Sequence, residues 1–495
     1  MQMMRKTIAF LAFLSLISPV AASAATDCVT FGGNLTFGAS GSDVTKLQQF
    51  LKDQGYFSAT MVPHFGNATL AAVRSFQSAQ GISQTGTVGP LTRAAIQRVS
   101  CGGGAVNSSP TNTTSNKFEI TGWMPYWRAT TSTLDVLPHL DLVSEVNPFV
   151  YSVKTDGTIV DNGGMDKEPW TSFIAAAKAK KVRVIPTVMW SNADAMHAIL
   201  RDATLRVALE DRIANLAKAN NFDGIDIDFE GKHADEKTYF ATFLKGLYQR
   251  MGSKWVTCDI ESRTPVDARY YGTEVPPDAT VYANDFAAIN KYCDRVKVMA
   301  YDQQGIDLEL SAQAASSSQV YGPVGDPFWV RKVINLMSKD ISKNKILIGV
   351  PTYGYEYDVT AYAGGQYTYD ILWTFNPGYA IPIAAQYGVT PVRNMAGEMQ
   401  FTYFPSGTAP NSGNAIAPVS LNSIPSALLA AAASSAYANA ANTHQTFRLM
   451  DWPDAVSIAG KADLAADLGV RGIAIFKMDG GEDPGMWNAL IGVKQ

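Results

Sequence analysis

Three carboxylate residues occupy alternate positions in the segment 222–230, which reads FDGIDIDFE. Successive side chains of a β-strand point to opposite faces, so Asp226, Asp228 and Glu230 share one face, while the apolar residues between them share the other. Carboxylates spaced ~6.6 Å apart along a strand cannot all ionise freely, so at least one should hold a proton near neutral pH. A carboxylic acid held protonated at a strand end is suited to protonating a glycosidic oxygen.

A calcium-binding loop is the competing interpretation of this segment. Such a loop requires a glutamate at its twelfth position, where Lys237 stands, and it does not alternate large apolar residues. The five histidines are scattered without ligand spacing. We therefore predict no metal site and no cofactor.

Eight strand-like apolar runs follow one another after Phe118, most of them separated by segments with helical periodicity. Eight β–α units in this length are typical of a (β/α)8 barrel, in which the active site lies at the carboxyl ends of the strands. The predicted fold is thus α/β: a TIM barrel with an α+β insertion after strand seven, preceded by a small three-helix domain. The runs are residues 120–127, 145–153, 182–190, 224–230, 255–261, 296–301, 346–353 and 472–476.

The stretch between the seventh and eighth runs is too long for a single crossover connection. It contains strand-like patches around residues 392–404 and 447–450, which predict an inserted lobe at about residues 358–450. The Ala/Ser/Asn/Pro-rich segment at roughly 406–442 is expected to be an exposed loop.

The N-terminus has the pattern of a secretory signal. Arg5 and Lys6 precede an apolar run at 7–20 and the small residues 21–25, which predicts a signal peptide at residues 1–24. A retained membrane anchor is the alternative, but the run is shorter than the ~20 residues that a spanning helix needs. The sequence therefore predicts a secreted protein, extracellular or associated with the cell wall, without stable membrane insertion.

Residues 28–101 form a second predicted unit, with three short helical patterns separated by Gly-rich turns. Cys28 and Cys101 bracket this segment, and a disulfide between them would stabilise its small core. Residues 102–116 are rich in Gly, Ser, Thr and Asn and are expected to be a flexible linker.

The sequence does not decide how the other two cysteines pair, and the net charge of the chain points to no particular partner. Cys258 and Cys293 lie near the starts of two neighbouring predicted strands, where they could be bridged or could be two small buried residues. The net charge of −4 on 495 residues gives no reason to propose nucleic acid or an anionic membrane as a partner.

The carboxylate segment, written Asp223-x-x-Asp226-x-Asp228-x-Glu230, resembles the signature of glycoside hydrolase family 18, the chitinase-like enzymes. Three more motifs with the family's order support this resemblance: GWMPYW at 122–127, MAYD at 299–302 and GVPTYG at 349–354. The resemblance covers residues 118–495, and it implies that they form a catalytic barrel.

The resemblance implies substrate-assisted, retaining hydrolysis, which is an exception to the usual scheme with two carboxylates. Glu230 would protonate the leaving oxygen and later activate water, while the substrate's 2-acetamido carbonyl attacks the anomeric carbon. Asp228 would orient the acetamido N–H and share a proton with Asp226, and Tyr301 would donate to the acetamido oxygen.

Aromatic rings near the strand ends complete the predicted site, because sugar faces stack on rings. Phe476 stands where the family has a tryptophan, and the third strand lacks the Ser-x-Gly-Gly of typical chitinases. In that respect, and in the segment GEDP at 481–484, the chain is closer to the branch that trims peptidoglycan of spores and walls. The predicted substrate-binding residues are Trp123, Tyr126, Phe149, Tyr151, Trp190, Met299, Asp302, Tyr353 and Phe476.

Residues 28–101 resemble the peptidoglycan-binding domain of bacterial wall hydrolases, with Pro63-His64 in place of the family's Asp-Gly. The predicted partners are therefore the cell wall, through this domain, and a polysaccharide substrate, peptidoglycan or chitin. The predicted function is hydrolysis of β-1,4 linkages in polymers that contain N-acetylglucosamine, with peptidoglycan favoured. Chitinase activity is one alternative. A non-catalytic, lectin-like wall-binding barrel is another, and the presence of Glu230 argues against it.

Overall fold

The computed structural model describes residues 29–31, 33–80, 84–100, 118–316, 319–406, 408 and 424–493. The signal peptide, the linker at 102–116 and the pair Cys28–Cys101 lie outside these residues, so all three remain predictions.

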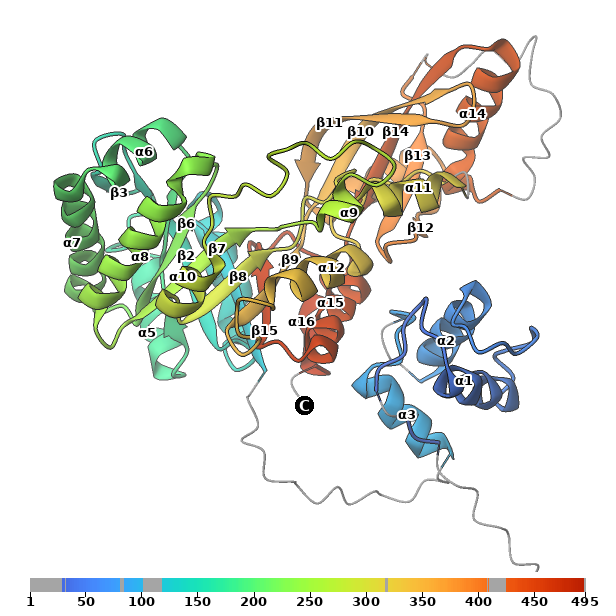
Figure 1. Ribbon diagram of the computed structural model, residues 1–495, viewed down its shortest axis with the longest axis horizontal. Helices are drawn as coiled ribbons and strands as arrows, with labels where there is room; N and C mark the ends of the chain where they lie inside the picture. The colour runs from blue at the N-terminus through green and yellow to red at the C-terminus, as the bar shows by residue number, and fades with distance from the viewer. Residues whose placement is uncertain are drawn as a thin grey trace, which may run out of the picture.

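The N-terminal unit contains the three predicted helices (Figure 1). The first two present apolar residues at helical spacing, and those of the first helix, Val44, Leu47 and Leu51, are fully buried. Together with Phe50, Phe76 and their neighbours they form a separate small core. The helices are α1 (Ser42–Asp53), α2 (Asn67–Ala79) and α3 (Pro90–Ser100).

Eight parallel strand positions close into a barrel, which confirms the predicted fold. The strand order is β1-β15-β9-β8-β7-β6-β5-β2, and β1 closes the sheet by pairing with β2 as well as β15. Figure 1 shows helices packed around the outside of this sheet. The barrel strands are β1 (Glu119–Pro125), β2 (Glu145–Val153), β4 (Arg183–Val184), β5 (Thr187–Trp190), β6 (Gly224–Phe229), β7 (Trp255–Glu261), β8 (Arg295–Met299), β9 (Ile346–Pro351) and β15 (Gly472–Phe476), with β3 (Ile159–Asp161) at the edge.

The barrel helices alternate with these strands and bury their apolar faces against the sheet. Among the described residues, no helix combines the length and apolar character needed to cross a bilayer. The helices are α4 (Ala129–Val136), α5 (Trp170–Ala179), α6 (Ala193–Arg201), α7 (Ala203–Ala219), α8 (Lys237–Met251), α9 (Val266–Arg269), α10 (Phe286–Tyr292), α11 (Leu308–Ser316), α12 (Pro327–Met337), α15 (Ala455–Leu468) and α16 (Met486–Ile491). The 3-10 turn η1 (Tyr126–Arg128) follows β1 directly.

An inserted α+β lobe separates β9 from β15 and extends away from the barrel (Figure 1). Its antiparallel sheet has the order β11-β10-β14-β13-β12. The expected loop at 406–442 is partly wrong, because α14 lies in its second half, where an alanine-rich sequence favours a helix. The lobe contains β10 (Gly354–Tyr362), β11 (Tyr367–Phe375), α13 (Pro377–Gln386), β12 (Val392–Arg393), β13 (Met399–Tyr403), α14 (Leu429–Ala441) and β14 (His444–Trp452).

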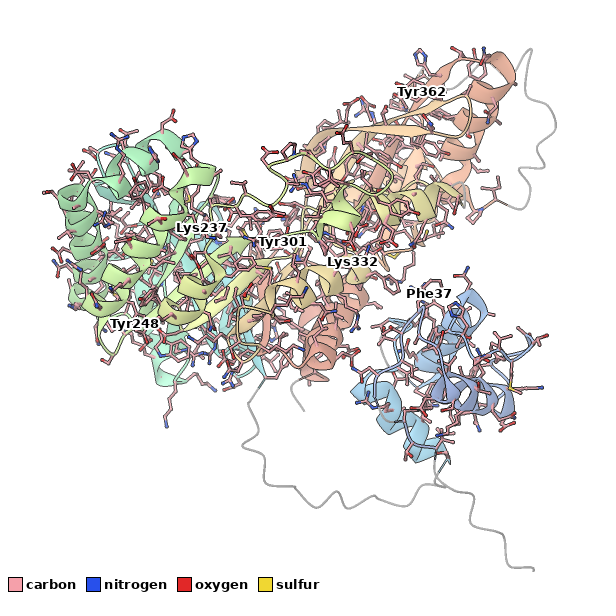
Figure 2. The ribbon with its side chains drawn as sticks, viewed as in Figure 1. Phe37, Lys237, Tyr248, Tyr301, Lys332 and Tyr362 are labelled. Atoms are coloured by element: carbon pink, nitrogen blue, oxygen red, sulfur yellow. A yellow bond between two sulfur atoms is a disulfide. The ribbon has the colours of Figure 1, made fainter. Side chains whose placement is uncertain are left out.

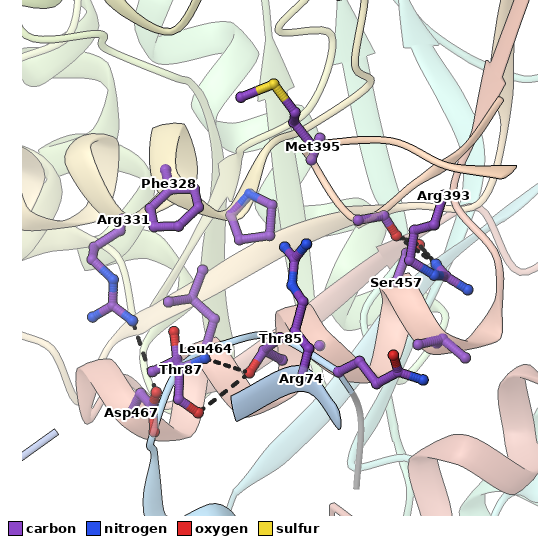
Figure 3. A pocket seen from close by; sticks show the side chains of 16 residues that line it. Arg74, Thr85, Thr87, Phe328, Arg331, Arg393, Met395, Ser457, Leu464 and Asp467 are labelled. Atoms are coloured by element: carbon purple, nitrogen blue, oxygen red, sulfur yellow. Dashed lines mark hydrogen bonds and ion pairs between the residues drawn. The ribbon is translucent and has the colours of Figure 1, made fainter. Parts of the chain in front are cut away.

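The N-terminal unit contacts the outer face of the barrel along α12 and α15. The Asn34 side chain donates to the backbone oxygen of Asp467 at 3.2 Å, and the ring of Phe37 lies edge-on to Phe328. Gly89 meets the Asp467 side chain so closely that a Cβ there would clash. Figure 3 shows residues of both units lining a small pocket in this seam.

A disulfide joins Cys258 of β7 to Cys293 at the end of α10. Both residues are fully buried, so the bridge ties a strand of the barrel to the helix that precedes the next strand. The structure thus decides the question that the sequence left open for this pair.

We expect the double variant Cys258→Ala/Cys293→Ala to unfold with a free energy lower by about 2–4 kcal/mol, because the bridge closes a loop with a sequence separation of 35. Denaturant titration of the oxidised wild type and the variant measures this difference. A double variant as stable as the wild type would contradict the expectation.

Candidate active site

Strand β6 places Asp226 and Asp228 inside the barrel and Glu230 at its mouth. Asp226 is fully buried, Asp228 is 5% exposed, and Glu230, one residue beyond the strand, is partly exposed. The apolar residues between them are buried against the helices, as the alternation predicts. The three carboxyl groups therefore run from the barrel interior to its carboxyl-terminal opening.

Asp226 is surrounded by hydrogen-bond donors from four other strands. It accepts from Lys297 at 2.8 Å, from Thr187 at 2.9 Å, from the indole of Trp123 at 2.9 Å, and also from Thr257. Burial raises its pKa, but the Lys297 ammonium and these hydrogen bonds outweigh burial and hold the pKa below its ordinary value. Asp226 is therefore ionised at neutral pH.

Lys297 of β8 is the positive centre of the barrel interior. Its side chain is fully buried and lies 2.8 Å from Asp226 and 3.3 Å from Glu145. Burial lowers its pKa, but the charges of Asp226, Glu145 and Asp259 raise it by more. Sequence reasoning missed Lys297 and Asp259, although their alternate positions on strands β8 and β7 could have pointed to the barrel interior.

The proton beside Asp226 is placed on Asp259 of β7. Burial and the charge of Asp226 raise the pKa of Asp259 well above its ordinary value, so Asp259 can donate a hydrogen bond to Asp226. Asp259 is thus the carboxyl that hydrogen-bonds Asp226 here, and the sharing of a proton between Asp226 and Asp228 stays a prediction. The indole nitrogen of Trp123 reaches both members of that pair, at 2.9 and 3.1 Å.

Asp228 and Glu230 form a second carboxyl pair, close enough to hydrogen-bond when one holds a proton. Burial raises the pKa of Asp228 well above its ordinary value, and the charge of Glu230 adds to this effect. Burial also raises the pKa of Glu230, against the lowering effect of the hydrogen bond from Asp228. The pair therefore retains a proton into the neutral range, at the place where a general acid is needed.

Glu261 and Lys232 act on Glu230 with opposite sign. After burial and the Asp228 hydrogen bond, the charge of Glu261 raises the pKa of Glu230 and that of Lys232 lowers it. Glu261, at the end of β7, accepts from the backbone N–H of Gly231 at 3.2 Å and from Asn284 at 2.6 Å. Both charged groups are thus fixed beside the proposed acid.

Removing these charges should move the alkaline limb of the pH–rate profile in opposite directions. Glu230 must be protonated to act as an acid, so kcat/KM should fall as pH rises through its pKa. Glu261→Gln should lower that pKa and move the limb to lower pH, whereas Lys232→Met should move it to higher pH. Profiles of the two variants and the wild type measure this, and shifts of the same sign would contradict it.

An aromatic floor lies beside the carboxyl groups, with Phe476 at its centre. Tyr301 stacks on the Phe476 ring at 5.7 Å, while Tyr353 and Trp123 meet it edge-on at 6.0 and 5.7 Å. The Phe149 ring lies 6.2 Å from it. Figure 2 shows Tyr301 where the barrel meets the inserted lobe. A phenylalanine therefore fills the place where the family resemblance leads one to expect tryptophan.

Two clefts open along this floor. The smaller, about 240 Å³, contains Asp228 and Glu230 and is also lined by Phe149 and Trp190. The larger, about 780 Å³, lies between the barrel and the lobe. Its lining residues are Trp127, Arg128, Asp302, Tyr353, Tyr355, Trp373, Thr374, Phe375, Asn376, Tyr379, Phe476, Lys477 and Asp479.

Asp302, which follows β8, lines the larger cleft, and its role in binding substrate stays a prediction. It has a positive φ of 57° and accepts hydrogen bonds from the hydroxyl of Tyr353 and, at 2.6 Å, from that of Tyr355. Its free acceptor capacity faces the cleft that would hold sugar hydroxyls.

Four predicted substrate-binding residues lie elsewhere. Trp123 is 2% exposed and supports the carboxylates beneath the floor, and Met299 is packed among the tyrosines near β10. Tyr126 packs on the barrel core next to Trp127, which itself faces the larger cleft. Tyr151 packs against Phe222 on the outside of the barrel.

Several cleft residues were missed because they lie outside the barrel strands. Trp373 and Tyr379 belong to the inserted lobe, and Arg128 and Lys477 follow the ends of β1 and β15. Alternating aromatics in 367–373 were a usable signal, but the sequence could not place the lobe beside the site. In the described part of the chain, no group of three or more His, Cys, Asp or Glu side chains is arranged to hold a metal ion.

The family model described as glycosyl hydrolases family 18 matches residues 120–481, and a model of a peptidoglycan-binding domain matches residues 40–96. The chain is 24% identical over 225 residues to the uncharacterized glycosylase YvbX of Bacillus subtilis. That alignment covers 44% of this chain and 60% of YvbX, so the match spans less than two thirds of this relative.

Solved structures share the fold at low identity. The spore cortex-lytic enzyme SleL of Bacillus megaterium superposes with a TM-score of 0.53 and 20% identity, covering 76% of this chain and 74% of SleL. A class V chitinase from Pseudomonas fluorescens gives a TM-score of 0.54 and 20% identity, covering 76% of this chain and all of the chitinase chain. One barrel architecture thus occurs in proteins named for two different polymers.

Proposed function

The chain belongs to glycosyl hydrolases family 18, and from this premise we propose that it is a retaining glycosidase that cleaves peptidoglycan glycan strands at N-acetylglucosamine. The observation that carries the proposal is the carboxyl pair Asp228–Glu230, which holds a proton at the mouth of an aromatic-floored cleft. The relatives named for spore cortex lysis and the peptidoglycan-binding match support the choice of polymer.

In the proposed mechanism, Glu230 gives its proton to the glycosidic oxygen as the bond to the anomeric carbon breaks. The acetamido carbonyl oxygen of the same sugar attacks that carbon and forms an oxazolinium ring. With the proton of the pair on Glu230, the ionised Asp228 accepts a hydrogen bond from the acetamido N–H, and the Tyr301 hydroxyl donates one to the acetamido oxygen. Glu230, now ionised, takes a proton from water, which opens the ring with net retention.

The groups around the pair keep one proton on it before substrate binds, and they keep the Tyr301 hydroxyl protonated. The ionised Asp226, fixed by Lys297, raises the pKa of Asp228 less than burial and Glu230 do, but in the same direction. Burial raises the pKa of Tyr301 well above its ordinary value, and the charges of Asp259 and Asp228 add to this, so its hydroxyl stays a hydrogen-bond donor.

The N-terminal unit would hold the enzyme on its substrate. We propose that residues 28–101 bind the wall and that residues 102–116 tether them to the catalytic barrel of residues 118–495. A tether of this kind raises the effective concentration of glycan near the cleft. Together with the signal pattern at residues 1–24, this supports the proposal that the enzyme acts outside the cell, in contact with the wall.

Product analysis tests the proposal. Residues 25–495 would be incubated with purified peptidoglycan, with the same glycan after chemical removal of its N-acetyl groups, and with chitin oligomers. We expect products ending in reducing N-acetylglucosamine from the first substrate and none from the second, because the nucleophile is the acetamido group. Cleavage of chitin oligomers alone would instead favour a chitinase, and cleavage of the deacetylated glycan would exclude substrate assistance.

A further inference from the structure

The larger cleft contains two cations at the end formed by η1 and the segment after β15. Lys477 donates to Asn376 at 2.8 Å and also to Asp479, whose side chain is 1% exposed. The Nε of Arg128 lies 3.8 Å from the same carboxylate, and the Arg128 side chain is 43% exposed. One buried carboxylate is therefore shared by two cations, and Arg128 turns towards solvent.

Two further acidic residues near this end of the cleft, Glu482 and Asp302, have partners other than Arg128 and Lys477. Glu482 accepts from the backbone N–H of Asp479 at 3.3 Å, but burial, with its contact to Asp135, raises its pKa to about 9. Glu482 is thus uncharged at neutral pH. Asp302, the remaining acid in the lining, is bound to the hydroxyls of Tyr353 and Tyr355. At this end of the cleft, Arg128 and Lys477 are therefore both paired with a single carboxylate, Asp479, and the exposed guanidinium of Arg128 keeps donors that face the cleft.

Exposed aromatic rings line the same cleft and continue the floor outward. Trp127 is 51% exposed, Trp373 is 46% exposed and Tyr379 is 45% exposed. Half-exposed rings in a cleft of about 780 Å³ provide stacking surfaces for more than one sugar. Because Trp127 and Arg128 are adjacent in η1 and line one cleft, a sugar on this side would carry its substituents close to the guanidinium.

We propose that Arg128, backed by Lys477, binds a carboxylate carried on the O3 substituent of an N-acetylmuramic acid residue next to the cleaved N-acetylglucosamine. The inference rests on the proposed function and deepens it. In peptidoglycan the two sugars alternate, so both neighbours of that N-acetylglucosamine are muramyl sugars. Chitin carries no carboxylate, and a guanidinium matches carboxylate geometry. The smaller cleft, which contains the proposed acid, has no cation in its lining.

The carboxylate has two possible sources: the lactyl group itself where the peptide is removed, or the stem peptide attached to it. Five substrates separate them: glycan freed of peptides, glycan bearing stems, the methylamide of each of these two glycans, and chitotetraose. We expect the wild type to favour carboxylate-bearing glycan over its methylamide by about tenfold in kcat/KM, as for a hydrogen bond to a charged group. A preference confined to the peptide-free glycan identifies the lactyl group, and one confined to stem-bearing glycan identifies the stem.

Arg128→Met should lower kcat/KM for carboxylate-bearing glycan about tenfold more than for the methylamides and chitotetraose, so that the preference disappears, while Arg128→Lys should retain part of it. The matched control is Arg201→Met, at the exposed end of α6 away from both clefts. Affinity for carboxylate-bearing glycan would also be measured by calorimetry in a Glu230→Gln background, where Arg128→Met should weaken binding about tenfold.

The proposed subsite would be wrong if Arg128→Met lost the same factor in kcat/KM on carboxylated and neutral glycans. It would also be wrong if the wild type did not distinguish these glycans. Neither result would contradict the proposed function. Turnover of chitotetraose alone, with no calorimetric preference for carboxylate, would overturn both. If no glycan is cleaved, the proposed function falls, and calorimetry in the same background still decides the subsite by itself.

Discussion

Glu230→Gln is expected to lower kcat on peptidoglycan by a factor between about 10² and 10⁴, with the glycan still bound. Glutamine keeps the shape of the side chain but cannot release a proton to the leaving oxygen or take one from water. Because the same carboxyl serves both steps, no other residue in the described cleft replaces it. Release of reducing ends measures the rate, and calorimetry with intact glycan measures binding.

The matched control is Glu309→Gln. The Glu309 carboxylate pairs with Lys332, and Glu309 lines neither cleft. This variant should hydrolyse glycan at the wild-type rate. The residual activity of Glu230→Gln should also lose the alkaline limb of its pH profile, because that limb reports the titration of Glu230. A variant that keeps wild-type kcat would remove Glu230 from the mechanism.

Lys297→Met should lower the free energy of unfolding by about 3–5 kcal/mol at neutral pH, because it leaves buried carboxylates without their counter-charge. In the wild type, the lowered pKa of Asp226 stabilises the fold above the pKa of the unfolded carboxyl, and this is lost as pH falls. In the variant, burial alone would raise that pKa, so stability would be lost as pH rises. The deficit should therefore shrink towards acid pH.

Lys461→Met is the matched control, since Lys461 is also fully buried and lies 3.0 Å from Glu398, outside both clefts. Both variants should lose stability, but Lys297→Met should also lose activity per folded molecule, because the Asp226–Asp259 pair would rearrange beneath Asp228. Denaturant titrations at several pH values, with activities corrected for the folded fraction, separate these effects. An equal deficit at pH 5 and pH 8 would contradict the assignment.

The barrel was predictable because each strand carries its own apolar run, and β6 also carries the alternation that aims its carboxyl groups inward. Local periodicity is enough for both inferences. The carboxyl environment was not predictable in the same way. Lys297, Asp259 and Glu145 come from strands far apart in sequence, and only the closed sheet brings them together around Asp226.

Tyr151 illustrates where simple alternation fails. On a regular β2, Phe149 and Tyr151 would face the same side, and both would point into the site. The pairing of β2 with β5 shifts register between these two residues, and after the shift Tyr151 packs on the outside against Phe222. A one-residue irregularity of this kind reverses the face of every later side chain. Pro148, directly before Phe149, is the one local residue that could have pointed to a bulge.

The inserted lobe leaves and rejoins the barrel through neighbouring strands, since Tyr355 of β10 pairs with Asp451 of β14. The two points at which the chain enters and leaves the lobe therefore lie side by side. The distance between these points does not depend on the length or structure of the rest of the lobe. During evolution, the inserted lobe could be exchanged, shortened or enlarged without opening the barrel or displacing Glu230. Selection can in this way change which glycan decorations are accepted while the bond-breaking chemistry is inherited intact.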